Sequence, residues 1–418
     1  MTDRTPTTIH ASSNAWAGTQ PWPRLPDGEW VIGGQRLSRA VAAVGSTPCY
    51  LYDRSRISAR VHGLRATLPP AIRLHYAMKA NPMPALVCHM AGLVDGIDVA
   101  SRGELRVALD AGMAPAAISF AGPGKSDAEL QQSVAAGILV NMESFREVEP
   151  LAKASEACGV PARVAVRVNL PFELRASGMK MSGGARPFGV DAEHVPQLLR
   201  AIGAAGLAFE GFHLFAGSQN LRSAAIIEAQ TKSYELVLGW LALCPAAPKT
   251  LNLGGGFGIP YTLQDVPLDL QPVADNLAEL LHRVHSDVPG AHLALELGRY
   301  LVGEAGLYVA RVVDRKLSRG QVFLVVDGGM HHHLAASGNF GQVMRRNFPV
   351  AINAHRGRTE TASVVGPLCT PLDLLADRAE LDVAEPGDLV VVFQSGAYGR
   401  SASPRQFLSH PEAVEALI

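Results

Sequence analysis

Short apolar segments rich in β-branched residues alternate with longer segments of helical spacing between about residue 70 and residue 300. Eight of the short segments have the length and composition of buried strands. They cover residues 72–76, 96–99, 117–120, 138–141, 163–168, 208–214, 250–253 and 292–296. Eight strand–helix units in about 230 residues match the size of a (β/α)₈ barrel. An open, doubly wound sheet built from the same units is the alternative fold.

The segments between these strands carry residues that begin and end helices. Asp or Ser stands before several of them, where it can cap a helix, and glycine follows several of them, where it can end one. The predicted helices include residues 101–112, 143–158, 191–204, 224–243 and 271–286.

The pattern changes after residue 305 to β-rich segments joined by turns, which predicts a separate all-β domain. The predicted strands there are 307–313, 321–326, 361–365 and 388–394. Residues 30–52 are also strand-like and precede the barrel, so they can pair into this second domain. We therefore expect an N-terminal segment, 1–45, that partly joins the β domain, a barrel at 46–303 and a C-terminal β domain at 304–418.

Charge and cysteine content narrow the class of partner and the compartment. A formal net charge of -1 and a pI near 6.9 give no basic surface for nucleic acid or for an anionic membrane. The five cysteines are widely spaced and form no CxxC pair, which favours a reducing compartment. No apolar segment is long enough to span a bilayer, and the first thirty residues do not resemble a signal peptide. We expect a cytoplasmic protein with a small-molecule partner.

The chemically distinctive residues fall where a barrel needs them. In a (β/α)₈ barrel, chemistry takes place at the C-terminal ends of the strands, because those loops converge on one face. The residues at or just after predicted strand ends are Lys79, Asp98, Arg167, Phe215 to Ser218, Gly254, Gly255, Gly256 and Glu296.

Three of these features together indicate pyridoxal 5'-phosphate. The consecutive glycines from Gly254 allow backbone N–H groups to approach a phosphate, and Arg299 follows the next strand, although a glycine triplet alone is more often a tight turn. A lysine beside a phosphate site can form a Schiff base with an aldehyde, and Lys79 fits that role. Glu296 is placed to keep a pyridine nitrogen protonated. The alternative for Lys79 is a strand-end lysine that extends to solvent.

Seven ordered motifs carry a family resemblance. "HYAMKANP", "DVASRGEL", "FHLFAGSQ", "NLGGGFG", "ELGRYLV", "GPLCTPLD" and "GAYG", spread over about residues 45 to 400, resemble the motifs of the fold type III pyridoxal-phosphate decarboxylases of the ornithine and diaminopimelate type. The resemblance implies an alanine-racemase-like (β/α)₈ barrel followed by a β domain. It also implies decarboxylation of an amino acid by a homodimer with shared active sites.

The resemblance also assigns roles to particular residues. It implies that Lys79 is bonded to the cofactor and that Glu296 meets the pyridine nitrogen. Asp98, Glu104 and Arg167 would orient the lysine and the cofactor. The partner subunit would supply Cys369 as the acid that protonates the substrate carbon. The phosphate would be held by Gly254, Gly255, Gly256, Ser218, Arg299 and Tyr398.

Departures from the family motifs bear on the substrate. Phe215 stands where the family usually places a histidine stacked on the cofactor ring, and Leu297 replaces a proline. Thr370 follows Cys369, where ornithine and diaminopimelate enzymes carry an acidic residue that meets the distal amine of the substrate. The segment 177–189, with Lys180 and Arg186, looks like that of relatives acting on carrier-tethered amino acids or in siderophore and exopolysaccharide pathways. A solvated surface loop explains those two charges equally well.

We therefore expect decarboxylation of an amino acid or an amino-acid-derived substrate, free or tethered to a carrier protein. A decarboxylase of free diaminopimelate, ornithine or lysine is one alternative. A racemase of the same fold is another, although racemases usually need a tyrosine base on the opposite ring face. The third alternative is a non-catalytic regulator that binds pyridoxal phosphate.

Three other features indicate no further chemistry. "SFAGPGKS" at 119–126 has Ser119 where a nucleotide-binding loop needs glycine, so a helix cap is expected. "MHHHL" at 330–334 is interpreted as a strand, on which adjacent side chains point to opposite faces and do not chelate one ion. These histidines could instead reach a substrate carboxylate across the dimer, and we predict no metal site. His213 is expected to be an ordinary hydrogen-bonded histidine of the barrel.

Overall fold

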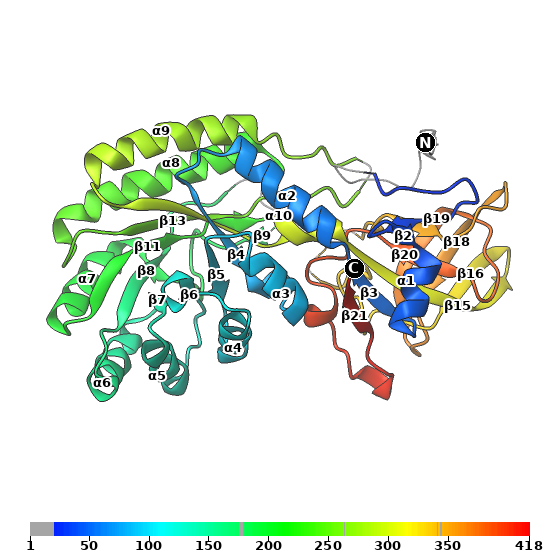
Figure 1. Ribbon diagram of the computed structural model, residues 1–418, viewed down its shortest axis with the longest axis horizontal. Coiled ribbons are helices and arrows are strands. Elements are labelled where there is room, and N and C mark those ends of the chain that lie inside the picture. The colour runs from blue at the N-terminus through cyan, green and yellow to red at the C-terminus, as the bar shows by residue number, and fades with distance from the viewer. Residues whose placement is uncertain (1–20, 175–178, 263, 341, 343–344) are drawn as a thin grey trace, which may run out of the picture. The chain divides into compact units, whose positions relative to one another are not determined.

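The computed structural model describes residues 21–174, 179–262, 264–340, 342 and 345–418. The chain forms two compact units (Figure 1). Of the described residues, those in Ser58–Ile259 and Leu268–Leu301 form the barrel unit. Those from residue 21 to Ile57, in Pro260–Pro267 and in Val302–Ile418 form the β unit. No described helix is long and apolar enough to cross a membrane.

Eight parallel strands close the barrel. Their order is β4, β5, β6, β7, β8, β11, β13 and β14, and β14 pairs with β4 to complete the ring. The closure confirms the (β/α)₈ barrel and excludes the open sheet. The strands are β4 (Arg73–Ala77), β5 (Gly96–Val99), β6 (Ile118–Phe120), β7 (Leu139–Met142), β8 (Arg163–Asn169), β11 (Ala208–Leu214), β13 (Thr250–Gly255) and β14 (His292–Leu297).

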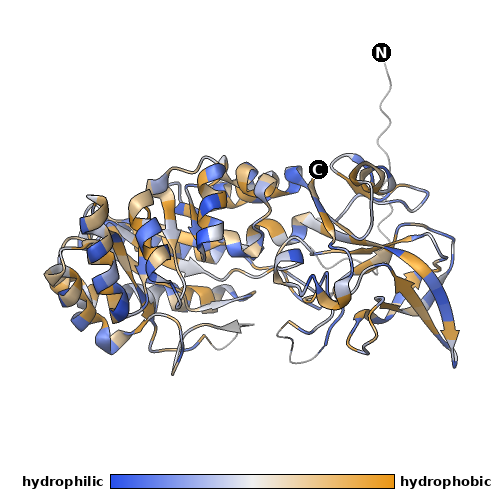
Figure 2. Ribbon diagram, turned by 90° about the horizontal axis from the view of Figure 1, so that it is seen from below, coloured by the Kyte–Doolittle hydropathy of each residue, from blue (hydrophilic) through white to orange (hydrophobic). Residues whose placement is uncertain are grey.

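Helices follow the barrel strands and cover the outside of the ring (Figure 1). α7 buries Val195, Leu198, Leu199 and Ile202, a spacing that puts all four on one helical face. Figure 2 shows both hydrophilic and hydrophobic residues along these helices. They are α2 (Arg54–Thr67), α3 (Pro84–Ala91), α4 (Arg102–Asp110), α5 (Asp127–Ala136), α6 (Val148–Cys158), α7 (Val195–Ala204), α8 (Ser223–Trp240), α9 (Gln271–Asp287) and the short α10 (Arg299–Val302).

The "SFAGPGKS" segment caps a helix, as its sequence predicts. The Ser126 side chain accepts a hydrogen bond from the backbone N–H of Glu129, and the Glu129 carboxylate accepts one from the backbone N–H of Ser126. This reciprocal capping box begins α5. Lys125, from the same segment, is buried and its ammonium lies 3.0 Å from the Glu147 carboxylate.

The β unit is built on one mixed sheet in the order β17, β20, β15, β16, β18, β19. β3 also pairs with β15, and β21 pairs with β3. β3 belongs to the strand-like segment 30–52 and pairs within the β unit, although it lies inside the range 46–303 expected for the barrel. The strands are β3 (Cys49–Tyr52), β15 (Gly306–Ser318), β16 (Gln321–Val326), β17 (Val350–Ile352), β18 (Thr359–Val365), β19 (Leu374–Asp382), β20 (Leu389–Val392) and β21 (Val414–Leu417).

The hydrophobic core of the β unit is formed by residues from both ends of the chain. Trp22 and Trp30 pack against Phe393, with ring centroids 6.5 and 5.0 Å from it. The hairpin of β1 (Val31–Ile32) and β2 (Gln35–Arg36) and the helix α1 (Leu37–Val44) add Ile32 and Leu37 to this core. The segment that precedes the barrel in sequence is therefore needed to complete the second domain.

The strand predicted at residues 330–334 is wrong. Met330 to His332 lie in turns, and His332 and His333 each donate a backbone hydrogen bond to the Gly329 carbonyl. Added Cβ atoms at Gly328 and Gly329 would lie 2.1 Å from the Tyr308 hydroxyl and 2.0 Å from the Asp373 carboxylate. Two glycines packed this closely let the chain turn inward instead of extending as a strand.

Candidate active site

Lys79 lies in the short helical turn that directly follows β4. Its ammonium nitrogen is 3.3 Å from Oε1 of Glu296, at the end of β14, and 42% of its side chain is exposed. The Tyr76 hydroxyl donates to the Asn81 carbonyl at 2.8 Å, which fixes the turn on its far side. The lysine is therefore held at the C-terminal end of the barrel with a carboxylate partner and with access from solvent.

Glu296 is buried, with 5% of its side chain exposed. Nε2 of His213, from β11, lies 2.8 Å from Oε2 of Glu296. Burial alone would raise the pKa of Glu296. The Lys79 charge and the hydrogen bond from His213 outweigh burial and hold that pKa well below its usual range. Glu296 is consequently an anion throughout the range in which proteins are handled.

Phe215 supplies an aromatic ring next to the lysine. The Lys79 nitrogen lies 5.1 Å from the centroid of the Phe215 ring, within the range of a cation–π contact. The residue is buried and directly follows β11. Lys79, Glu296 and Phe215 thus come together as the sequence predicts.

Asp98 accepts two hydrogen bonds at the end of β5. Nδ1 of His75 lies 3.2 Å from Oδ1 of Asp98, and the Ser119 hydroxyl donates to the same oxygen. Burial would lower the pKa of His75, but the adjacent Asp98 charge raises it above its usual value. Oδ2 of Asp98 is buried and has no hydrogen-bond partner among the described residues, so one carboxylate oxygen remains available.

Arg167 is held by a carboxylate that the sequence analysis missed. Its Nη1 donates to Oε1 of Glu143 at 2.7 Å. Glu143 also accepts hydrogen bonds from the backbone N–H groups of Gly122, at 2.5 Å, and Gly189, at 2.9 Å. Burial would raise the pKa of Glu143, but the charges of Arg167 and Lys125 lower it. Glu143 follows the end of β7, and strand-end position would have identified it.

Glu104 lies in the first turn of α4. Its carboxylate accepts a hydrogen bond from the Ala100 backbone N–H at 2.7 Å. Burial raises the pKa of Glu104 despite that bond. The Lys79 charge opposes that rise, so the two groups interact electrostatically. A role of Glu104 in orienting the lysine stays a prediction.

The three consecutive glycines permit close backbone packing at the end of β13. Gly254 and Gly256 have φ values of 67° and 71°, which favour glycine. A Cβ atom at Gly254 would lie 2.7 Å from the Leu214 carbonyl, and one at Gly256 would lie 2.0 Å from the Gly217 carbonyl. A Cβ atom at Gly255 would lie 2.3 Å from the Glu296 carbonyl oxygen. The fold itself therefore requires these glycines, and phosphate binding is a second role that stays a prediction.

Ser218 and Arg299 both belong to the barrel unit. Ser218 belongs to β12 (Gly217–Ser218), which pairs antiparallel with β9 (Met179–Lys180). Arg299 begins α10 directly after Gly298, where a Cβ atom would lie 2.8 Å from Ala80 Cβ. This close packing places the start of α10 against the turn that carries Lys79.

Tyr398 and Cys369 lie in the β unit. Tyr398 has a φ of 54°, and its ring centroid is 6.3 Å from that of Phe340. Cys369 is exposed, as a residue that reaches a second subunit has to be. Its assignment as the acid stays a prediction.

The segment 177–189 is only partly described, because residues 177 and 178 lie outside the described residues. Arg186 donates to the Gly183 carbonyl at 3.1 Å and lies 3.5 Å from the Glu173 carboxylate. The charge of Arg186 is therefore partly balanced within the segment.

The three consecutive histidines are buried within the β unit. Nε2 of His332 lies 2.8 Å from the Pro411 carbonyl, and Nε2 of His333 lies 2.9 Å from the Ser395 hydroxyl. In the described part of the chain, only Asp191, Glu193 and His194 have ligand atoms close enough together to share a metal ion, and all three are exposed. Burial of all three rings argues against direct contact with a substrate carboxylate.

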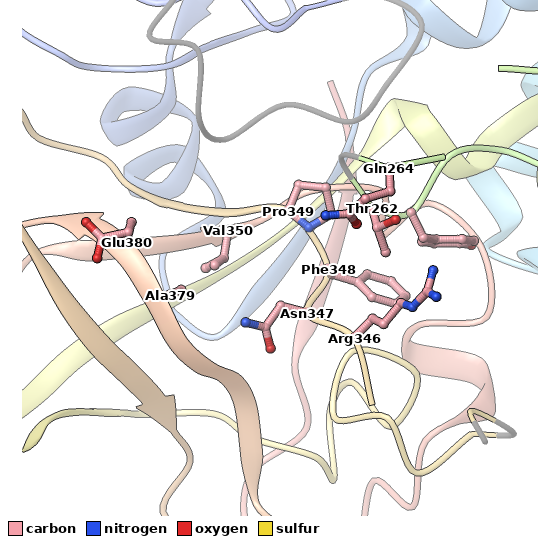
Figure 3. Close-up of a pocket in the computed structure, with 10 residues that line it drawn as sticks. Thr262, Gln264, Arg346, Asn347, Phe348, Pro349, Val350, Ala379 and Glu380 are labelled. Carbon is pink, nitrogen blue, oxygen red and sulfur yellow. The ribbon is translucent and has the colours of Figure 1, made fainter. Parts of the chain in front are cut away.

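A cavity of about 450 Å³ lies in the β unit (Figure 3). Its lining includes Tyr261, Thr262, Arg346, Phe348 and Glu380, and the Tyr261 and Phe348 ring centroids are 4.6 Å apart. None of the predicted site residues lines it. Its described lining includes no lysine and no buried carboxylate. We therefore place the chemistry at Lys79, Glu296 and Phe215, which we call the barrel cluster.

The barrel cluster fits pyridoxal 5'-phosphate by the chemistry of its groups. A pyridoxal ring needs an amine for its aldehyde, an anion for its protonated ring nitrogen and a flat surface for its face. Lys79, Glu296 and Phe215 provide these three within contact of one another. The buried oxygen of Asp98 without a partner adds an acceptor for a polar group of a bound molecule.

Comparison with known proteins gives the same chemistry. Residues 54–303 match the family described as "Pyridoxal-dependent decarboxylase, pyridoxal binding domain". L-glutamyl-[BtrI acyl-carrier protein] decarboxylase of Niallia circulans is 37% identical over 383 residues, which cover 89% of this chain and 88% of that protein. Diaminopimelate decarboxylase of Aquifex aeolicus is 33% identical over 405 residues, covering 95% and 92%.

The fold has a solved counterpart of similar length. The crystal structure of diaminopimelate decarboxylase from M. jannaschii aligns with a TM-score of 0.85 at 26% identity, covering 94% of this chain and 92% of that one. Both units of the chain are therefore represented in that structure.

Proposed function

Because this chain belongs to the pyridoxal-dependent decarboxylase family, we propose that its substrate is an acidic amino acid joined through its side-chain carboxyl group to a carrier protein. The chain is a pyridoxal-phosphate-dependent carboxy-lyase that acts on an amino acid. A carboxy-lyase needs the α-carboxylate free. An acyl link to a carrier therefore has to use a second carboxyl group, which only an acidic amino acid provides.

One residue carries the proposal about the substrate. Thr370 follows Cys369, at the position where the free-diamine enzymes have an acidic partner for the distal amine. A threonine offers a neutral hydroxyl, so a free cationic side chain would be desolvated there without a counter-charge. An uncharged thioester or amide link has no such need. The relative from Niallia circulans, named for a glutamyl carrier-protein substrate, supports the same choice.

The barrel residues would hold the cofactor in a defined orientation. We assign the aldehyde to Lys79, the ring nitrogen to Glu296 and one ring face to Phe215. The bound cofactor supplies a protonated ring that accepts the electron pair left on Cα when carbon dioxide departs. Glu296, whose pKa is held low in this structure, would keep the proton on the ring nitrogen. The phosphate is assigned to Gly254, Gly255, Gly256, Ser218, Arg299 and Tyr398.

Two residues of this chain would handle the remaining proton. Lys79 is released when the substrate amine takes its place, and its amine can then hold or deliver a proton next to Glu296. We propose that Cys369 of the partner subunit donates the proton that replaces the carboxylate on Cα. That role makes the homodimer part of the proposed function. The five free cysteines fit the reducing cytoplasm in which a thiol acid would stay reduced.

The test is turnover by the purified, cofactor-loaded enzyme. Glutamyl- and aspartyl-loaded carrier proteins, free glutamate, meso-diaminopimelate, ornithine and lysine are incubated separately, and the loss of carbon dioxide is followed by mass. We expect turnover of a loaded carrier and none of the free diamino acids. Efficient turnover of diaminopimelate would contradict the interpretation of Thr370.

The second candidate is decarboxylation of free diaminopimelate, which the similarity to the Aquifex aeolicus and M. jannaschii enzymes favours. The variant Thr370→Glu restores the acidic residue at this position and separates the two candidates. If the neutral residue sets the substrate, the variant loses activity on the loaded carrier. Thr370→Ser, which keeps the hydroxyl, is the matched control. Inversion without loss of carbon dioxide would instead identify a racemase.

A further inference from the structure

His213 occupies a position in the barrel interior that links two strands through their side chains. β13 lies between β11 and β14 in the barrel. His213 is level with Asn252 of β13, and Glu296 of β14 is level with Gly255. Nε2 of His213 and Oε2 of Glu296 nevertheless lie 2.8 Å apart. β13, the strand between them, ends in glycines, which have no side chain to separate the two groups.

The hydrogen bond between them has only one possible direction. Glu296 is ionised, and a carboxylate can only accept, so Nε2 of His213 has to carry the hydrogen. The other ring nitrogen, Nδ1, is buried and has no partner among the described residues. The ring therefore reaches the carboxylate through Nε2, and Nδ1 makes no hydrogen bond to another described residue.

This arrangement divides the two oxygens of Glu296 between two tasks. Oε2 is occupied by His213, which is 2% exposed. Oε1 faces Lys79 at 3.3 Å and is the oxygen left for a ligand. The buried donor restrains one oxygen of the carboxylate and leaves the other facing Lys79.

We propose that His213 is a positioning residue that fixes the Glu296 carboxylate through its Nε2–H donor, so that Oε1 of Glu296 faces the ring nitrogen of the cofactor. The inference rests on the proposed placement of Glu296 at that nitrogen. It adds a role for a residue outside the cofactor contact itself, since His213 acts only through Glu296.

The test measures binding of a probe that cannot bond to Lys79. Pyridoxine 5'-phosphate has an alcohol in place of the aldehyde, and its carbocyclic analogue has C–H in place of the ring nitrogen. The affinity of the apoenzyme for each is measured by calorimetry. His213→Leu should weaken binding of pyridoxine 5'-phosphate about tenfold to a hundredfold, the range of a hydrogen bond to a charged group, and leave binding of the analogue unchanged.

Two further variants keep the test decisive if His213→Leu does not fold. His213→Gln places an amide N–H close to the position of Nε2 and should bind both probes as the wild type does. His213→Asn keeps polarity but falls short of Glu296, and should behave like His213→Leu. His292→Gln is the matched control, since His292 begins the same strand, β14, that ends in Glu296. It should change neither affinity.

Each other outcome has one meaning. Equal weakening of both probes in His213→Leu or His213→Asn would mean that the histidine is merely structural, and no change in either would mean that Glu296 needs no such restraint. Both results overturn the inference. Glu296→Gln separates it from the proposed function. If that variant does not discriminate between the probes, the placement of Glu296 at the ring nitrogen is wrong. If Glu296→Gln discriminates between the two probes while His213→Leu does not, the placement of Glu296 stands and only the proposed role of His213 is wrong.

Discussion

Acid should destabilise the β unit through its buried histidines. Burial lowers the pKa of His331 to about 3 and that of His333 to about 3, against an ordinary value of 6.5. The neutral form is the one that folding favours, so the full stability is present above pH 6.5 and is lost as the pH falls from 6.5 towards 3. The window follows from the difference between these folded-state values and the ordinary pKa.

The size of the effect follows from linkage. At pH 5, each ring is about 1.5 units below its unfolded pKa and still above its folded pKa. One pKa unit corresponds to about 1.4 kcal/mol, so each histidine should cost about 2 kcal/mol relative to pH 8. The two together should cost about 4 kcal/mol, a large part of the stability of an ordinary domain.

Urea unfolding at pH 5 and pH 8, followed by tryptophan fluorescence, measures this difference, because Trp22 and Trp30 are both buried in the β-unit core. His331→Leu is the informative variant. Neither ring nitrogen of His331 has a hydrogen-bond partner among the described residues, so leucine removes the titration without breaking a bond. The variant should reduce the difference between the two pH values by about 2 kcal/mol. His62→Leu, at an exposed position of α2, is the control.

The reasoning would be refuted if His331→Leu unfolded with the same pH dependence as the wild type. It would also fail if the wild type were equally stable at the two pH values. Either result would show that the buried rings titrate in the folded protein as freely as in the unfolded chain.

Other predictions follow from the site. If Cys369 of one subunit serves Lys79 of the other, mixing the two inactive variants Lys79→Ala and Cys369→Ala in equal amounts should restore activity after subunit exchange. We expect about 25% of wild-type activity, because half of the dimers are mixed and each mixed dimer has one intact site of two. A mixture without activity would contradict shared sites. Gly256→Ala should lower the free energy of unfolding, measured with urea, by about 2–4 kcal/mol, because the added Cβ meets the Gly217 carbonyl at a position of positive φ. Gly290→Ala is the control: its Cβ would meet nothing within 4 Å, so it should cost only the strain of its positive φ. Ser126→Ala should lower it by about 1 kcal/mol by removing the cap of α5, while Ser126→Asp should not.

The barrel was predictable because its signals are local and repeated. Each buried strand is a short apolar segment followed by a turn and a helix, and the sequence shows this unit eight times. The strands β17, β19 and β21 were not predicted. β17 is only three residues long, and β19 carries charged residues among its apolar ones, "LLADRAELD". Pairing with distant strands, which no local pattern encodes, makes these segments strands.

The candidate site shows the same division between local and distant information. Lys79 and Glu296 could be identified because each stands at a strand end, and barrel geometry then brings strand ends together. Glu143 satisfies the same criterion, because it directly follows β7, and it was equally predictable from its position at a strand end. Its contact with Gly189, in contrast, depends on how the segment after β8 returns to the barrel, which the sequence does not reveal.

His213 could not have been assigned by position alone. It lies inside a strand, where a buried hydrogen-bonded histidine is the ordinary expectation, and its partner is 83 residues away in sequence. Two facts of the folded chain give it a role: its Nε2 lies 2.8 Å from Oε2 of Glu296, and its Nδ1 has no partner among the described residues. Substitution of Phe215 for the usual histidine removes one imidazole from the cofactor face. In this chain, His213 is therefore the imidazole that remains in direct contact with the carboxylate assigned to the ring nitrogen.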